Sequence, residues 1–135
     1  MANNNNQISS QARFSLTLGA ALGFLGVALG AFGAHALKAK LGPDLLTIFE
    51  TGVRYQMYHA LALLLLGVLG LHWPEQKRLK WVTGTFALGI LIFSGSLYML
   101  ALTGVRLWGA VTPLGGLCFL LGWTLLALTA LKAQN

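Results

Sequence analysis

The sequence predicts an all-α membrane protein, a four-transmembrane-helix bundle with a short interfacial helix between helices 1 and 2. Two observations carry this prediction. Charged residues make up only 9% of the 135 residues, against about 25% in soluble proteins. The chain also has four stretches without Asp, Glu, Lys or Arg, at residues 14–37, 55–74, 81–105 and 107–131. Each is long enough for the helix of roughly 20 residues that crosses a hydrocarbon core of about 30 Å.

The four apolar stretches are predicted to be helices because every backbone polar group in lipid needs an internal partner. The expected helices cover residues 14–36, 53–71, 81–102 and 107–131. The first apolar run is longer than the roughly 7–15 residues of a signal peptide, so we expect it to remain as a helix. The Asn-rich residues 1–12 are expected to form a disordered polar tail, and residues 13–132 a single transmembrane domain.

The interfacial helix is predicted within residues 41–51. Pro43 and Asp44 are residue types that favour the first turn of a helix. Apolar side chains then follow at i, i+3 and i+4 from Leu45, which places them on one helical face. Such an amphipathic segment is typical of a helix that lies in the membrane interface. Gly52 is expected to end it before the second span begins.

The first span carries glycines at a spacing of 4, 3, 4 and 3 residues. They are Gly19, Gly23, Gly26, Gly30 and Gly33. This is a 3.5-residue repeat, the period of left-handed helix packing. Because lipid provides no hydrophobic drive between helices, small residues permit the close backbone contact on which association depends. We therefore predict that this stripe packs helices and that the first helix is the central, most buried one; the alternative is a pore lining.

The positive charge points to lipid head groups rather than to nucleic acid. The formal net charge is +6, but the basic residues lie at the ends of the apolar runs and in the short loop around Lys77. With both termini in the cytoplasm, five Lys and Arg residues lie on the cytoplasmic side and four on the other. We predict this orientation, in the plasma or inner membrane. The expected partners are the lipid bilayer and, beyond it, a second copy or another membrane protein.

Polar side chains inside a membrane are costly and are candidates for function. Counting helical rise from the predicted helix ends places eight of them together at the non-cytoplasmic end. They are His35, Glu50, Arg54, Tyr58, His59, Ser94, Tyr98 and Arg106. The inner halves of the helices are expected to be almost wholly apolar. The cluster is interpreted as a surface for packing and for contact with a partner or lipid.

Two alternatives stay open for this cluster. One is a small-solute or proton transporter or channel component formed by oligomerisation; the other is a metal or haem carrier that uses the two histidines of the cluster. The sequence contains no Gly-x-Ser-x-Gly, no His-Glu-x-x-His and no phosphate-binding loop. No catalytic residue, metal site or cofactor is therefore predicted, and the expectation is a non-enzyme.

Four segments together resemble a known family. They are LGAFGAHAL at residues 29–37, FETGVRYQMYHAL at 49–61, FSGSLY at 93–98 and RLWGAVTPLGG at 106–116. The chain is similar, from about residue 14 to 131, to small bacterial inner-membrane proteins catalogued as domain of unknown function 423, with eukaryotic relatives called transmembrane protein 256. The resemblance implies a multi-pass α-helical protein of the plasma membrane and implies no activity.

Overall fold

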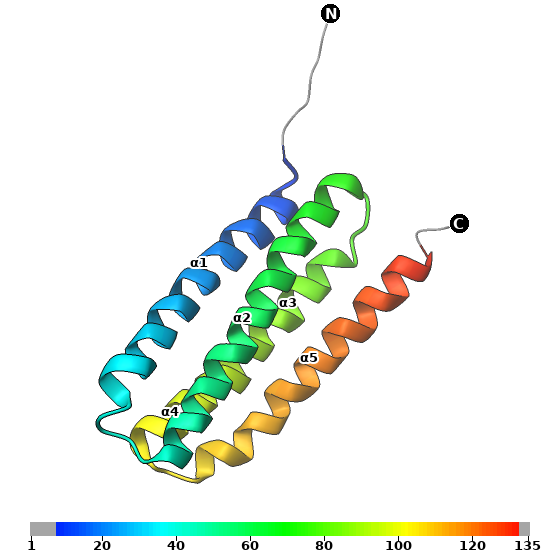
Figure 1. The fold of residues 1–135 in the computed structure, drawn as a ribbon. Helices are drawn as coiled ribbons and strands as arrows, with labels where there is room; N and C mark the ends of the chain where they lie inside the picture. Colours follow the sequence, from blue (N-terminus) through cyan, green and yellow to red (C-terminus); the bar gives the residue numbers. More distant parts are fainter. Residues whose placement is uncertain (1–7, 133–135) are drawn as a thin grey trace, which may run out of the picture.

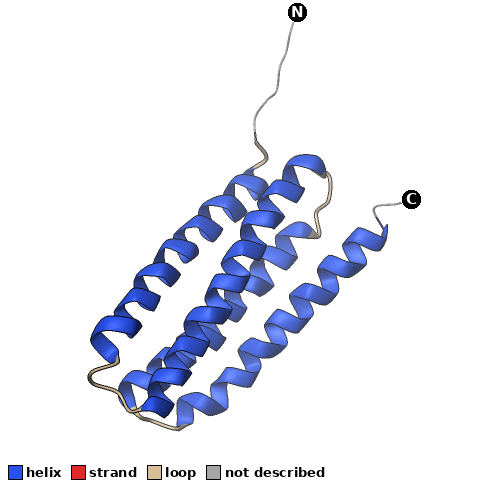
Figure 2. Ribbon diagram, in the orientation of Figure 1, coloured by secondary structure: helices blue, strands red, loops and turns tan. Residues whose placement is uncertain are grey.

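The computed structural model describes residues 8–132, and they form helices with no strand among them (Figures 1 and 2). The first span joins α1 (Ser10–Phe32) to a π-helical turn, η1 (Gly33–Leu37), and α2 (Pro43–His72) is the second. The third joins α3 (Leu79–Gly89), a π-helical turn η2 (Ile90–Ser94) and α4 (Gly95–Thr103); α5 (Leu107–Lys132) is the fourth. All four are long and apolar enough to cross a membrane, which confirms the predicted fold class.

The four spans form an open arrangement rather than a closed square. α1 packs along α2, and α5 packs along α3, η2 and α4. α2 joins the two pairs through its contacts with η2 and α4. α1 and α5 lie on opposite flanks, as Figure 1 shows. Much of the surface of each flanking helix is therefore not covered by other parts of the described chain.

The central helix is α2, and the prediction that the first helix is the most buried one is wrong. In the most apolar window of each span, 17% of residues are buried in the first span against 44% in α2. The largest cluster of buried apolar side chains joins α2 to α3 and α5, with Leu63, Leu66, Phe86 and Phe119 among its members. The glycine stripe brings α1 close to one neighbour only, which leaves α1 at the edge.

The predicted interfacial segment is helical, but it is continuous with the second span. α2 begins at Pro43, with Asp44 in its first turn, and runs without a break through Gly52. Gly52 is buried, and a Cβ there would lie 2.8 Å from Cε1 of Tyr98. The glycine therefore permits the close approach of α4 instead of ending a helix. The predicted separate interfacial helix is the first part of α2.

α1 also begins earlier than predicted, at Ser10. The hydroxyl of Ser9 accepts a hydrogen bond from the backbone N–H of Ala12, at 3.2 Å, and this cap fixes the start of the helix. Residues 10–12 of the predicted tail are therefore helical. Residues 1–7 of that prediction lie outside the described residues.

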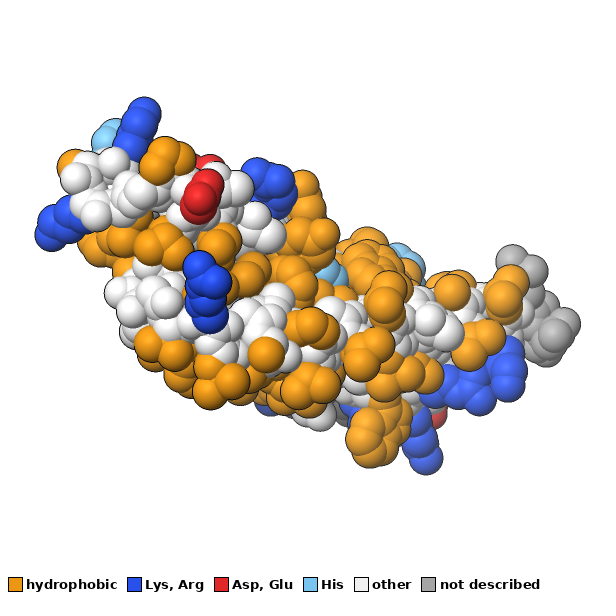
Figure 3. Space-filling model, turned by 90° about the horizontal axis from the view of Figure 1, so that it is seen from below, with side chains coloured by type: hydrophobic (Ala, Val, Ile, Leu, Met, Phe, Trp, Pro, Cys, Tyr) orange, Lys and Arg blue, Asp and Glu red, His pale blue; other side chains and the backbone are white. Residues whose placement is uncertain are grey.

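The two ends of the bundle differ in their connections. The described chain ends and the loop at residues 73–78 lie at one end, which we call the terminal end (Figure 1). The connections at residues 38–42 and 104–106 lie at the other, the loop end; there Gly104 ends α4 with a φ of 70°, a backbone conformation that favours glycine. Figure 3 shows charged side chains gathered toward both ends and hydrophobic side chains between them. This is the distribution of a protein that crosses a bilayer.

Candidate functional site

The eight polar residues predicted as one cluster separate into two groups. His59 and Ser94 are buried and Tyr98 is half-buried. The exposed members are His35, Glu50, Arg54, Tyr58 and Arg106. Within residues 8–132 no hydrogen bond joins any two of the eight. His59, Ser94 and Tyr98 each bond to partners outside the predicted cluster. They do not form a single site.

His59 lies in the middle third of α2, deeper than its predicted place near the helix end, because α2 starts ten residues earlier than expected. Its Nδ1 lies 2.8 Å from the carbonyl oxygen of Tyr55. A carbonyl can only accept, so Nδ1 carries the proton and Nε2 is free to accept. The indole N–H of Trp123 on α5 donates to Nε2 at 3.1 Å. Both ring nitrogens of a neutral imidazole are therefore satisfied, and neither is free to bind a metal.

An aromatic groove surrounds His59 between α2 and α5. The imidazole stacks on Phe119 with ring centroids 3.5 Å apart and planes 9° apart. Tyr55 packs on Phe93 at 4.7 Å, and Trp123 forms one edge of the groove. The hollow has a volume of about 550 Å³ and is open on its outer side. Apart from the imidazole, the phenol and the indole, its lining is apolar, which suits contact with lipid or with an apolar partner.

A second hydrogen-bonded chain crosses the bundle through Gln56, which is buried. The phenol of Tyr98 on α4 donates to the Gln56 carbonyl oxygen at 2.8 Å. The Gln56 amide donates to the backbone oxygen of Leu22 on α1 at 2.9 Å. One side chain of α2 therefore links the spans on its two sides. Because the partners are all internal, this chain holds the helices in register.

Serine hydroxyls connect η2 and α4 to their neighbours. Ser94 donates to the backbone oxygen of Gly52 on α2 at 2.7 Å. The hydroxyls of Ser96 and Thr112 lie 2.7 Å apart and join α4 to α5. All of these groups are buried. Their role in the structure is interhelical bonding of the kind that small polar residues provide in membranes.

Buried polar groups also occur at the terminal end, where the inner halves of the helices were predicted to be almost wholly apolar. The hydroxyls of Ser15 on α1 and Thr83 on α3 lie 2.8 Å apart, and the Gln11 amide donates to Ser15 at 3.1 Å. The prediction of one polar end is therefore wrong. A Ser or Thr hydroxyl can donate to a carbonyl of its own helix, as Thr83 does to Leu79, so its burial in a membrane helix costs little free energy. Buried hydroxyls can therefore occur in stretches that look apolar in the sequence, and the prediction did not count them.

Two residues central to these contacts, Gln56 and Trp123, were not predicted as members of the site. Gln56 could have been found from sequence, because an amide inside the apolar run 55–74 needs buried partners. Trp123 could not, since its hydrogen bond spans 64 residues of sequence and depends on how α5 lies against the bundle.

Four of the five glycines of the stripe in the first span face α2. A Cβ at Gly19 would lie 2.9 Å from the backbone of Ala60 and of Leu64, and a Cβ at Gly33 3.1 Å from the Phe49 ring. Gly26 and Gly30 face the side chains of Met57 and Val53. Gly23 has no atom within 4 Å of its Cβ position and stands outside this contact. The stripe thus lies in a helix–helix interface along α2 and does not line a pore.

Metal ligands do not gather anywhere in the described chain. Within residues 8–132, no group of three or more His, Cys, Asp or Glu side chains is placed to hold an ion. His35 is exposed at the loop end, and His59 uses both nitrogens. The structure offers no observation in favour of a histidine-bound metal or haem.

The fold and its contacts define a multi-pass α-helical membrane protein. The family model for a protein of unknown function, DUF423, matches residues 29–116, and the chain belongs to this family, which confirms the predicted resemblance. It is 45% identical over 128 residues to the UPF0382 inner membrane protein YgdD of Escherichia coli, covering 92% of this chain and 94% of that protein. It is 43% identical over 117 residues to a UPF0382 membrane protein of Staphylococcus haemolyticus, covering 87% and 94%. No solved structure matches the chain.

Proposed function

We propose that the protein is a non-enzymatic membrane protein whose buried polar groups fix the packing of an open bundle and whose exposed polar residues at the loop end contact lipid head groups or a membrane partner. In this proposal His59, Ser94 and Tyr98 are packing residues. Arg54 and Tyr58 lie four residues apart on one exposed face in the middle third of α2, and they extend the contact surface from the loop end toward the middle of the bundle. The loop end faces away from the cytoplasm in the orientation that the sequence predicts.

One observation carries the proposal. Within the described residues, every buried side-chain nitrogen and oxygen has a hydrogen-bond partner inside the protein. A catalytic or transport site needs polar groups that are free to meet a substrate, whereas a closed network is structural. The polar groups of the bundle also form separate sets, at Ser15, at Gln56 and at Ser96, with no hydrogen bond from one set to the next among residues 8–132. This arrangement supports packing rather than a conducting path.

Two groups of variants test the division of roles. Tyr98→Phe and Ser94→Ala each remove a hydroxyl donor and are expected to lower the melting temperature of the purified protein. Arg54→Gln removes a charge at an exposed position and is expected to leave the melting temperature unchanged. A photoreactive amino acid at Tyr58 then reports contact in intact membranes, as crosslinked products of defined mass.

The expected result is that Arg54→Gln reduces the crosslinks formed from position 58. Lys132→Gln, an exposed charge at the opposite end, is the matched control and should leave them unchanged. If the parent, Arg54→Gln and Lys132→Gln all give the same crosslinks, the proposed contact role is refuted. Loss of a turnover or transport activity in Tyr98→Phe, with its melting temperature unchanged, would refute the packing role.

A further inference from the structure

A long furrow runs between α1 and the third span, on a face where α1 has no other neighbour among residues 8–132. At the terminal end it opens as a hollow of about 490 Å³. This hollow is lined by Ser10, Gln11, Phe14, Lys80, Thr83 and Gly84. Further along lies a second hollow of about 390 Å³. Its walls include Leu18, Leu22 and Leu29 of α1 and Ala87, Leu91 and Gly95 of the third span. Both volumes fall in the range of about 300–1,000 Å³ typical of ligand sites.

The two hollows follow one another along the same pair of helix faces. The lining residues of α1, from Gln11 to Leu29, recur every three or four positions and so share one face. Those of the third span, from Lys80 to Tyr98, do the same. Either series covers 19 residues, whose ends are about 27 Å apart along the helix axis. One acyl chain, which covers about half of a hydrocarbon core of about 30 Å, fits within this length.

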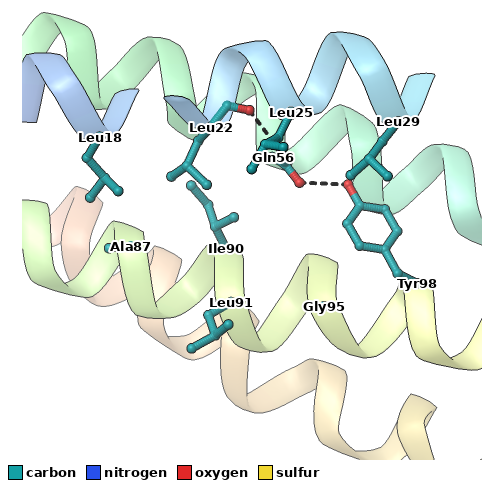
Figure 4. Close-up of a pocket in the computed structure, with 10 residues that line it drawn as sticks. All are labelled: Leu18, Leu22, Leu25, Leu29, Gln56, Ala87, Ile90, Leu91, Gly95 and Tyr98. Atoms are coloured by element: carbon teal, nitrogen blue, oxygen red, sulfur yellow. Dashed lines mark hydrogen bonds between the residues drawn. The ribbon is translucent and has the colours of Figure 1, made fainter. Parts of the chain in front are cut away.

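The furrow is accessible from the side. Its floor is α2, which contributes Gln56, and its rims carry Leu25, 49% exposed, and Leu91, 71% exposed. In Figure 4, Leu22 and Ile90 point toward each other across the furrow, and open space remains between Ile90 and the ring of Tyr98. The Tyr98–Gln56 hydrogen bond lies at the far end. A ligand chain can therefore enter from the lipid phase without any opening of the bundle.

The charge of the furrow changes along its length. Its mouth at the terminal end carries Lys80, with Lys77 and Arg78 in the loop just before it. Glu75 is the carboxylate of that loop, so the three bases leave a formal charge of +2. The first hollow also has polar groups at Ser10, Gln11 and Thr83, and the Thr83 hydroxyl is already hydrogen-bonded to Ser15. Beyond this hollow the lining is apolar as far as Gln56 and Tyr98, which bond to each other. The furrow thus fits a molecule with an anionic head and an apolar tail.

From this arrangement we infer that the furrow binds an anionic phospholipid from the leaflet at the terminal end. The lipid phosphate lies at Lys80, and one acyl chain runs between α1 and α3. Basic pockets between transmembrane helices are a known way to recognise anionic head groups. A second copy of the chain is the other possible occupant of the furrow. An apolar helix face of a second copy would gain nothing from positive charge at the mouth, so the charge favours an anionic lipid. This lipid site goes beyond the proposed function and lies at the opposite end of the bundle from the proposed contact surface. An experiment can therefore refute one proposal without refuting the other.

Lipid retention by the full-length protein tests the head-group contact. The protein, purified in detergent, is mixed with equal amounts of phosphatidylglycerol and phosphatidylcholine of identical acyl chains, and native mass spectrometry counts the retained lipids. The parent is expected to retain one phosphatidylglycerol in preference to phosphatidylcholine. Lys80→Gln should weaken phosphatidylglycerol retention about fivefold and leave phosphatidylcholine unchanged. Lys132→Gln, at the same end but outside the furrow, should behave as the parent.

The chain itself provides a way to block the furrow. Gly84 lines the first hollow and has no atom within 4 Å of its Cβ position, so Gly84→Leu fills the hollow without a backbone clash. This variant should lose both lipids. Gly23→Leu is the matched control, since Gly23 is equally free of neighbours but does not line the furrow.

Three results would overturn the inference. The first is equal retention of the two lipids by the parent, and the second is parent-like retention by Gly84→Leu. The third is a parent dimer that Gly84→Leu converts to a monomer without change in bound lipid, which would assign the furrow to a second copy. If Gly84→Leu does not fold, the exposed substitution Lys80→Gln still decides the case through lipid preference.

Discussion

Gly115→Ala tests the closest approach of two helices in the bundle. α5 meets η2 at this position, and a Cβ on Gly115 would lie 2.7 Å from both Cα and Cβ of Phe93 and would overlap its backbone nitrogen. These are backbone atoms and the first side-chain carbon, so no rotamer change can relieve the contact. The neighbouring Gly116 provides a matched control, because the nearest atom to its Cβ position, Cδ2 of Phe93, is 3.9 Å away.

The magnitude follows from two opposing effects. Overpacking a close contact costs about 1–3 kcal/mol, and the helices must move apart to accept the methyl group. Alanine at an open helical position instead gains up to about 1 kcal/mol over glycine. Because Gly115 and Gly116 lie in the same helix, this gain is common to both variants and cancels in the comparison. We therefore expect Gly115→Ala to be less stable than Gly116→Ala by about 1–3 kcal/mol.

The assay is thermal unfolding of both variants in one detergent, followed by tryptophan fluorescence. About 1 kcal/mol corresponds to a shift of roughly 2–8 °C for domains of this size range, so Gly115→Ala should melt well below both the parent and Gly116→Ala. Equal melting temperatures for the two alanine variants would refute the close-contact reasoning. A larger loss in Gly116→Ala would mean that α5 is rotated relative to the arrangement described above.

Three further predictions concern single contacts, each checked by the same melting assay. Gly19→Ala should destabilise the protein, because its Cβ would lie 2.9 Å from the backbone of α2, whereas Gly23→Ala should be neutral or stabilising; the reverse order would contradict the α1–α2 interface. Tyr98→Phe should cost about 0.6 kcal/mol and at most about 1.7 kcal/mol, the range for interhelical hydrogen bonds in membranes. Trp123→Phe should cost a similar amount and change the ¹⁵N shift of His59 Nε2; an unchanged shift would show that the indole is not its donor.

The open arrangement of the spans explains why lipid contact recurs in these proposals. α1 is held by α2, α5 is held by the third span, and the two do not touch within the described residues. The furrow beside α1 and the aromatic groove beside α5 result from this arrangement. A closed bundle of the same four helices would have buried both.

Local composition was enough to predict the class of protein and the number of spans. A run of apolar residues in lipid has to satisfy its own backbone, so its length decides that it is a helix. The glycine stripe likewise indicated which face of α1 packs, because close contact needs small residues on one face. These properties depend on residues near each other in the chain.

Other features depend on residues far apart and were decided only by tertiary structure. Gly52 was expected to end a helix, yet packing against Tyr98 keeps it inside α2. The stripe showed that α1 packs, but which helix is central depends on the neighbours of α2. The partner of His59 lies 64 residues away, on a helix whose orientation no local pattern specifies. A side chain's depth and partners are set by where its helix begins and what lies against it, and both result from the assembly of all four spans.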